Sequence, residues 1–364
     1  NPTINISSLS ESGANYSFDG SSITTGAMLS FVGNSDLKWE TSVAKNFGID
    51  LGLYDNALSV SFEYFNILTK DLITRDNSLI SSTAIDAAAP LVNLGSVKNT
   101  GFDMSIGYNN KTTSGVTYGI QANISKYKNE VTELINAFQS GYSGFRGGAV
   151  TRTEVGRPIS SFYGLQVEGF DSNGRFTYVD TNGDGVTNDD DRTYIGSPHP
   201  DFTYGINLTA GYKNLDVSLF IQGSQGNDIY NYEKIYTDFP TFFNGNRSVR
   251  VLDSWTSSNT NATLPALSQT ITNNETSPNS YFVEDGSYMR LKNLQIGYTL
   301  ENKIATQIGA DSFRVYIQGS NLFTFTKYKG FDPEVISNDN LTLGVDNETY
   351  PLSRILTIGV NIKF

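Results

Sequence analysis

One stretch of the chain has oxygen-bearing side chains at the spacing of an EF-hand-type calcium loop. Calcium is a hard cation that binds oxygen, so clustered carboxylates, amides and a main-chain carbonyl suit it, and Gly185 permits the sharp turn that such a loop needs. A solvated turn rich in Asp and Asn would contain the same residues, and this alternative stays open. The candidate calcium ligands are Asp180, Asn182, Asp184, Val186 through its carbonyl, Asn188 and Asp191. We expect such an ion to stiffen the loop, and we expect no cofactor to be required.

A second candidate site is a loop rich in aromatic rings, residues 225–250. Aromatic faces can stack on sugar rings, and tyrosine suits a partly wet interface because one end of its ring is polar. The same rings could equally pack against neighbouring loops or a partner protein. The candidate ligand-contacting rings are Tyr230, Tyr232, Tyr236, Phe239, Phe242 and Phe243.

The sequence offers little material for catalysis. His199 is the only histidine and stands between two prolines, so a histidine-dependent triad or a multi-histidine metal site has little material, and we expect His199 to be structural. Cysteine is absent, which excludes a thiolate metal site and a cysteine nucleophile. We therefore predict that the chain is not an enzyme.

Long segments in which apolar and polar residues alternate connect these loops. In residues 44–53, for example, Phe47, Ile49 and Leu51 fall on one face and Asn46 falls on the other. A two-residue period is that of a β-strand, and segments of about ten residues exceed the ~5–6 residues of an ordinary strand, which disfavours a soluble β-sandwich. The predicted hairpins pair 44–53 with 58–64, 102–108 with 116–124, 204–210 with 215–221, and 294–298 with 313–317.

The connections alternate between short turns and long polar loops. The long loops are 71–98, 129–147, 171–200, 225–286 and 326–353. The alternation requires two weaker strands, 148–155 and 159–170, joined at Gly156-Arg157-Pro158. Short turns on one side and long loops on the other are the layout of outer-membrane barrels.

These patterns predict an all-β fold, an antiparallel transmembrane β-barrel of which the chain supplies about eleven strands. Large outer-membrane transporters have roughly 22 strands, so eleven would be the C-terminal half of one. We expect residues 1–43 to be the end of an extracellular loop and residues 44–364 to be barrel. The first residues lack the basic and apolar parts of a signal peptide, which fits either a fragment or a processed mature chain.

Composition and charge agree with such a barrel. The formal net charge is -12, which makes nucleic acid an unsuitable partner because nucleic-acid binding needs a basic surface. The 21 Tyr and 22 Phe are spread without any run of the ~20 apolar residues that a membrane helix needs. A barrel needs no such run, because only every second residue of its strands meets membrane lipid.

The last strand ends in a pattern that resembles the signal read by the barrel-assembly machinery. Apolar residues alternate with polar ones through residues 356–364, and the chain ends on an aromatic residue. The candidate assembly signal is Gly359, Ile362 and Phe364, and the plain alternative is an edge strand that happens to end in Phe.

Seven motifs run in order along nearly the whole chain. They are 36–40 (Asp-Leu-Lys-Trp-Glu) with 46–52, 156–164, 180–205, 222–230, 288–294, 321–323 and 330–334 (Gly-Phe-Asp-Pro-Glu). Together they resemble the SusC/RagA family of TonB-dependent transporters known from Bacteroidota. The family's plug domain and TonB-box peptide are not among these residues.

The resemblance implies an outer-membrane, multi-pass barrel that imports oligomeric nutrients with energy from the TonB complex. It also implies a SusD/RagB-like surface lipoprotein as a lid and a cargo that is most often an oligosaccharide. Three alternatives stay open, namely a peptide importer of the same family, a surface or adhesin barrel that transports nothing, and a secreted carbohydrate-binding β-protein.

Overall fold

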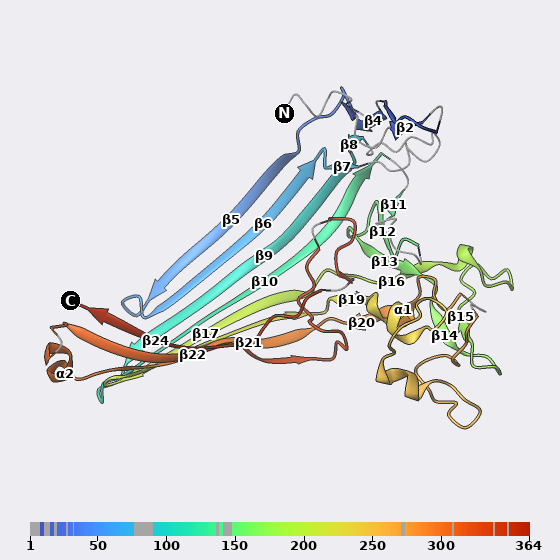
Figure 1. The fold of residues 1–364 in the computed structure, drawn as a ribbon. Helices are drawn as coiled ribbons and strands as arrows, with labels where there is room; N and C mark the ends of the chain where they lie inside the picture. Colours follow the sequence, from blue (N-terminus) through green and yellow to red (C-terminus); the bar gives the residue numbers. More distant parts are fainter. Residues whose placement is uncertain are drawn as a thin grey trace.

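The computed structural model describes residues 8–10, 15–17, 20–26, 28–31, 33–75, 90–135, 138–140, 148–270, 274–307, 309–337, 339–347 and 349–364. In that part of the chain, nine long strands form one curved antiparallel sheet, which we call the wall (Figure 1). They are β5 (Thr41–Leu53), β6 (Leu58–Lys70), β9 (Gly95–Lys111), β10 (Val116–Leu134), β17 (Phe202–Tyr212), β18 (Leu215–Gln225), β21 (Tyr288–Thr299), β22 (Ser312–Thr326) and β24 (Ile355–Lys363).

Each strand of the wall pairs with the wall strand that precedes or follows it in sequence, so the wall is an up-and-down meander. The partial barrel and its antiparallel strands confirm the predicted fold class. No helix among the described residues is both long and apolar enough to cross a membrane.

The register of the wall separates apolar and polar residues onto opposite faces. One apolar row crosses six strands through Leu51, Val60, Ile106, Ala122, Ile206 and Ile221. The next row, one residue along each strand, is polar or small and comprises Asp50, Ser61, Ser105, Asn123, Gly205 and Gln222. Because side chains alternate across a strand, the two rows face opposite sides of the same sheet.

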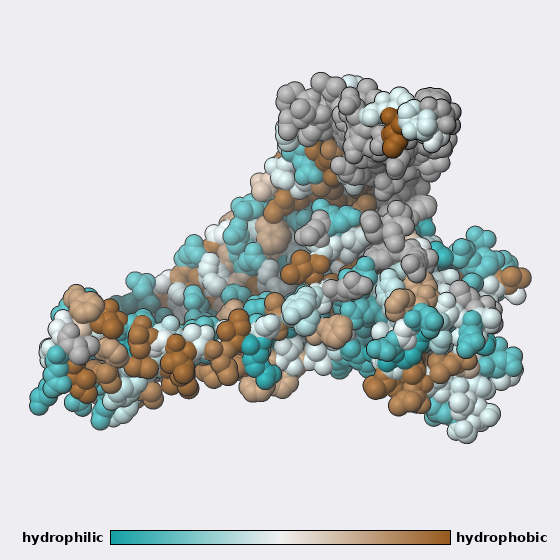
Figure 2. Space-filling view, in the orientation of Figure 1, coloured by the Kyte–Doolittle hydropathy of each residue, from teal (hydrophilic) through white to brown (hydrophobic). Residues whose placement is uncertain are grey.

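Within the described residues, no other segment covers the apolar face of the wall. Phe47 is 62% exposed, Ile106 41% and Ile362 42%, whereas a soluble sandwich would bury all three against a second sheet. Figure 2 shows apolar side chains gathered in a band along the long strands at the lower left. A surface of this kind suits hydrocarbon, and the alternative of a secreted β-protein is therefore not retained.

Short turns join the strands at one end of the wall and long connections join them at the other. The short turns are 54–57, 112–115, 213–214 and 300–311, the last containing α2 (Asn302–Gln307). The long connections are 71–94, 135–201, 226–287 and 327–354, and they gather at the opposite end of the strands from these turns (Figure 1).

The two weaker strands expected at 148–155 and 159–170 do not belong to the wall. Their central residues form β12 (Thr151–Glu154) and β13 (Ser161–Gly164), two members of a separate four-stranded sheet with β11 (Phe138–Ser140) and β16 (Thr193–Gly196). These strands have three or four residues each, too few to cross a bilayer as wall strands do. The expected eleven strands are therefore nine in the described chain, and 135–201 is one long connection.

The loops form a layer with its own hydrophobic core. Its elements are β7 (Ile73–Arg75), β8 (Leu91–Asn93), β14 (Val167–Phe170), β15 (Phe176–Tyr178), η3 (Asp189–Asp191), β19 (Asp228–Asn231), α1 (Glu233–Asp238), η4 (Val249–Asp253), η5 (Ser280–Phe282), β20 (Val283–Asp285) and β23 (Val345–Asp346). Residues 8–31 contain four short strands, β1 (Ser8–Ser10), β2 (Asn15–Tyr16), β3 (Thr24–Thr25) and β4 (Met28–Phe31). Part of the range 1–43, expected to be a loop end, lies outside the described residues.

The loop core is aromatic. Its buried members are Val150, Phe162, Leu165, Phe176, Tyr178, Tyr230, Tyr232, Ile235, Phe239, Phe282 and Val345. They come from four of the short strands, from α1, from η5 and from the loops between them, so the core ties distant parts of the sequence together. The wall is therefore held by the backbone hydrogen bonds between its strands and by what surrounds its two faces, whereas the loop layer is stabilised by burial of its own side chains.

Candidate functional site

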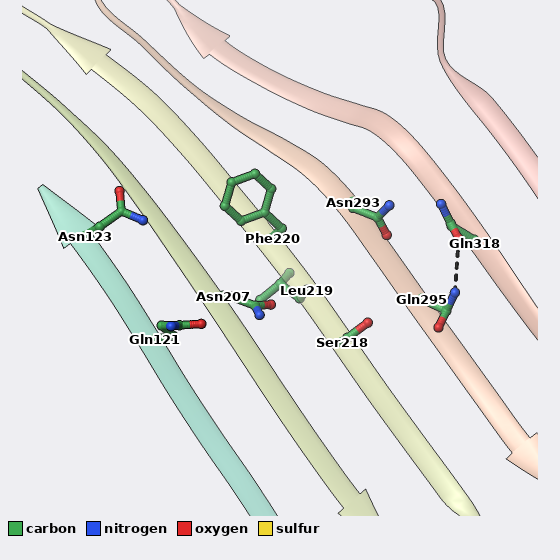
Figure 3. Close-up of a pocket in the computed structure, with 9 residues that line it drawn as sticks. All are labelled: Gln121, Asn123, Asn207, Ser218, Leu219, Phe220, Asn293, Gln295 and Gln318. Carbon is green, nitrogen blue, oxygen red and sulfur yellow. Dashed lines mark hydrogen bonds between the residues drawn. The ribbon is translucent and has the colours of Figure 1, made fainter. Parts of the chain in front are cut away.

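A cavity of about 510 Å³ lies on the polar face of the wall (Figure 3). It is lined by Gln121, Asn123, Asn207, Ser218, Leu219, Phe220, Asn293, Gln295 and Gln318. None of these nine residues carries a charge. We call this surface the amide patch, because six of its nine residues end in a carboxamide.

Strand register brings the amide patch together from residues far apart in sequence. Asn207 of β17 lies directly opposite Gln121 of β10 on one side and Phe220 of β18 on the other, and Phe220 in turn lies opposite Asn293 of β21. A second row joins Ser218, Gln295 and Gln318 in the same way. Side chains directly opposite each other in an antiparallel pair lie on the same face, so both rows face the cavity.

A chain of hydrogen bonds fixes two of the amides. Arg314 of β22 makes a bidentate pair with Asp216 of β18, through Nε to Oδ1 at 2.9 Å and Nη2 to Oδ2 at 2.5 Å. The Nη2 group of Arg314 also donates to Oε1 of Gln295 at 3.1 Å. Gln295 in turn donates from Nε2 to Oε1 of Gln318 at 3.0 Å, as the dashed line in Figure 3 marks.

Phe220 gives the patch one aromatic ring, and a glycine makes room for it. A Cβ atom at Gly205 would lie 3.3 Å from the Phe220 ring and 3.1 Å from both atoms of the Asn123 amide. Real Cβ atoms rarely make contacts as close as this, so a side chain at position 205 would displace both groups. Glycine at this position therefore preserves the shape of the cavity floor.

The patch has the chemistry of a binding surface and not of a catalytic one. Carboxamides both donate and accept hydrogen bonds but do not titrate, and the nine lining residues include no nucleophile, acid or base beyond one serine. A concave surface with convergent polar groups and one ring is typical of ligand recognition.

The candidate calcium loop is held by its own hydrogen bonds. Asp180 accepts the backbone N–H of Gly183 at 2.7 Å and of Gly185 at 2.8 Å, and Asp184 accepts that of Val186 at 2.8 Å. Asp191 is buried and accepts the N–H groups of Asn188 and Thr181, and these backbone bonds lower the pKa of its carboxyl.

These contacts fit the Asx-rich turn that the sequence left open. Asn188 caps η3, and Asn182 bonds to Asp184, so every expected side-chain ligand takes part in the turn network. Among the residues that the structure describes, no group of three or more His, Asp or Glu lies close enough to hold a metal ion. The calcium site stays a prediction, and binding would require these carboxylates to exchange backbone partners for the ion.

The aromatic loop contributes mainly to the core. Tyr230, Tyr232 and Phe239 are 2%, 1% and 5% exposed, so their faces are taken up by packing and no ligand can stack on them. Tyr236 and Phe242 are half-buried and lie edge to face, with ring centroids 5.4 Å apart. Phe243, at 48% exposed, is the most accessible of the six rings.

The last strand, β24, pairs with β22 at the edge of the wall. Ile362 lies opposite Phe313 on the apolar face, and Phe364 is 80% exposed. Gly359 lies under the ring of Tyr316, where a Cβ atom would come within 2.3 Å of a ring carbon. The glycine of the candidate assembly signal thus has a packing reason of its own, and the signalling role stays a prediction.

His199 links the loop layer to the wall. Its Nε2 lies 2.9 Å from the carbonyl oxygen of Ile159, and its Nδ1 lies 3.2 Å from the hydroxyl of Tyr127 on β10. A carbonyl can only accept, so Nε2 carries the proton and Nδ1 accepts from Tyr127. Burial lowers the pKa of His199, which keeps the ring neutral in this structural contact.

Comparison with known proteins places the chain among receptors. The family described as "TonB dependent receptor-like, beta-barrel" matches residues 5–222. TonB-dependent receptor P3 of Formosa agariphila is 33% identical to the chain, over 100% of the chain and 38% of that receptor. TonB-dependent receptor SusC of Bacteroides thetaiotaomicron is 29% identical, over 96% of the chain and 34% of SusC.

A solved structure of the RagAB peptide transporter has a similar fold. It matches 99% of the chain with a TM-score of 0.79 and 27% identity, and the match covers 38% of that transporter chain. The chain thus spans little more than a third of the length of its relatives. Because these relatives are receptors and transporters, the expectation that the chain is not an enzyme is confirmed.

Proposed function

This chain belongs to the TonB-dependent receptor-like β-barrel family and is of the SusC/RagA type, and on that basis we propose that it forms the C-terminal wall of a receptor that imports oligomeric nutrients across the outer membrane. In this proposal residues 44–364 are barrel, residues 1–43 are the end of an extracellular loop, and strands from the rest of a longer protein complete the wall.

The observation that carries the proposal is the division of the wall into two faces. Rows of Leu, Val and Ile face one side, where they suit lipid, and rows of Ser, Asn, Gln and Gly face the other, where they suit a watery lumen. Import then takes place along the polar face, and the long loops at the extracellular end capture the cargo.

We propose an oligosaccharide as the cargo. The amide patch supports this choice because carboxamides match hydroxyl groups, which also donate and accept, and because Phe220 offers a ring for a sugar face. A peptide is the second candidate, favoured by the similarity to a structure described as a peptide transporter. If the receptor takes up neither oligosaccharides nor peptides, the remaining candidate is a surface barrel that transports nothing.

The partners follow from the same type of receptor. We propose a SusD/RagB-like surface lipoprotein over the long loops, energy supplied by the TonB complex through the N-terminal parts of the longer protein, and insertion by the barrel-assembly machinery. A calcium ion in the loop 180–191 is part of the proposal as a stiffening element.

Uptake in cells tests the proposed function. The gene for the full-length receptor is deleted and then restored, and uptake of fluorescently labelled oligosaccharides and peptides is measured with and without a functional TonB complex. We expect uptake of at least one oligosaccharide that needs both the receptor and TonB. Uptake that is unchanged by deletion of the receptor for every oligomer would reject the proposal.

A further inference from the structure

We propose that the amide patch is a cargo-binding subsite inside the lumen, selective for uncharged polyhydroxylated ligands, and that Asp216 and Arg314 set the direction of its hydrogen bonds. The proposal rests on the proposed function, because it needs cargo to pass along the polar face. The site lies on the strands themselves and not on the extracellular loops.

The amides of the patch have the chemistry that a hydroxylated ligand needs. The side chains of Gln121, Asn123, Asn207 and Asn293 line the cavity, and none makes a side-chain hydrogen bond to another residue that the structure describes. Each of these amides has two N–H donors and one oxygen acceptor to offer. Four such groups on one concave surface match a ligand that carries several neighbouring hydroxyl groups.

The Asp216–Arg314 pair fixes the orientation of two amides, those of Gln295 and Gln318, on the other side of the cavity. A guanidinium group only donates, so it turns the oxygen of Gln295 toward itself and the nitrogen of Gln295 toward Gln318. The oxygen of Gln318 is thereby occupied, and its nitrogen remains as a donor. Figure 3 shows that nitrogen pointing toward Asn293.

The charge distribution determines the class of ligand. No lining residue is charged, and the adjacent Arg314 is already paired bidentately with Asp216. A carboxylate on the ligand would therefore lose its hydration without gaining a free cation, and an ammonium group would find no free carboxylate among the lining residues. Hydroxyl groups avoid both costs, and the ring of Phe220 can cover the apolar face of a sugar.

Binding to the full-length receptor in detergent tests the proposal by calorimetry. The probes are maltohexaose, xylohexaose and mannohexaose as neutral ligands, hexagalacturonate as an acidic ligand and hexaalanine as a peptide. We expect at least one neutral saccharide to bind more tightly than the other two classes. We expect Asn207→Ala and Gln318→Ala each to weaken that binding about fivefold to tenfold, as loss of one or two hydrogen bonds does.

Two further variants separate recognition from structure. Arg314→Met should weaken binding as much as Gln318→Ala does. The double variant should bind the saccharide as tightly as either single variant, because both substitutions act through the same donor, the side-chain nitrogen of Gln318. Asn46→Ala is the matched control, since Asn46 lies on the polar face of β5 outside the cavity, and it should leave affinity unchanged. Mobility in gels before and after heating confirms that each variant is folded.

Several results would overturn the subsite. In the first, Asn207→Ala and Gln318→Ala leave the affinity for neutral saccharides intact but lower the unfolding temperature of the receptor. The patch would then contact the plug domain of the longer protein instead of cargo. Others are tighter binding of hexagalacturonate or hexaalanine, and no binding of any neutral saccharide. TonB-dependent uptake of some other cargo in these cases would leave the proposed function standing.

Discussion

The ion pair between Arg290 and Asp332 should control the docking of the last long loop onto the wall. Arg290 lies on β21 and Asp332 lies in the connection 327–354, and their side chains are 2% and 5% exposed. Arg290 donates from Nη2 to Asp332 at 2.6 Å. Asp332 also accepts the backbone N–H groups of Glu334 at 2.9 Å and Leu352 at 3.0 Å, so one carboxylate joins both ends of the loop to the wall.

Replacing Arg290 by Met leaves a buried carboxylate without its cation. Breaking a buried pair by removing one partner costs about 3–5 kcal/mol, because the remaining charge is not compensated. A change of about 3 kcal/mol shifts an opening equilibrium about a hundredfold. The double variant Arg290→Met, Asp332→Leu leaves no uncompensated charge, but it also removes the acceptor of the Glu334 and Leu352 N–H groups, so it should not restore the docking of the loop.

Hydrogen–deuterium exchange on the full-length receptor measures this opening locally. We expect the amides of Glu334 and Leu352 to exchange about a hundredfold faster in Arg290→Met, with little change in β17 and β18. Lys327→Met is the control, because Lys327 is 86% exposed and lies 3.7 Å from Asp285, and an exposed pair contributes about 0–1 kcal/mol. Unchanged exchange at both amides in Arg290→Met would refute the reasoning.

Four further predictions concern stability, pH, metal and assembly. Tyr230→Ala should cost about 3–5 kcal/mol in the loop layer, because it empties a fully buried ring site, whereas Phe243→Ala should cost under about 0.5 kcal/mol; calorimetric unfolding compares them. Burial alone would raise the pKa of Asp332, but hydrogen bonds from Arg290 and two backbone N–H groups lower it. The ionised carboxylate therefore stabilises the docked loop fully above the ordinary pKa of about 4, and this stabilisation is lost as the pH falls below that value. Hydrogen–deuterium exchange of the loop amides, corrected for intrinsic rates, should show less protection in that acidic range. Calcium should bind the intact receptor and not Asp191→Ala, and calorimetry that detects no binding at millimolar calcium refutes the site. Removal of Phe364 should lower the amount of heat-modifiable receptor in outer membranes, and an unchanged amount contradicts the assembly signal.

Alternation in the sequence predicts the wall because it reports which residues meet lipid. Residues 44–53 and 58–64 were expected as strands, and β5 and β6 contain both. The pattern underestimates length where a strand continues beyond the lipid band. β10 runs to Leu134 although the apolar face stops near Ile124, because Lys126 and Lys128 follow on the same side and backbone pairing needs no apolar side chain.

Sequence patterns do not distinguish a strand of the wall from a strand of the loop layer. The strand expected at 148–155 is inferred from the alternation of short and long connections, and Thr151 and Thr153 are indeed on a strand, but one buried in the loop layer and not against lipid. The sequence does not show whether a ring such as that of Tyr230 packs in a protein core or stacks on a ligand, because both roles need the same apolar ring face. The amide patch was missed because its members lie on five strands, and only the register places Gln121 and Gln318 on one surface.

The two edge strands of the wall, β5 and β24, have backbone groups that need further partners. In the described part of the chain, β5 pairs only with β6 and β24 pairs only with β22, so each edge strand leaves the outward half of its N–H and C=O groups without a strand partner. An unpaired backbone group in hydrocarbon costs several kcal/mol, and strands of thirteen and nine residues would expose several such groups each. That total exceeds the about 5–15 kcal/mol by which a domain is normally stable, so these edges cannot face lipid. Both edges therefore need strand partners in a membrane, and the relatives, more than twice as long as this chain, have the length to supply them.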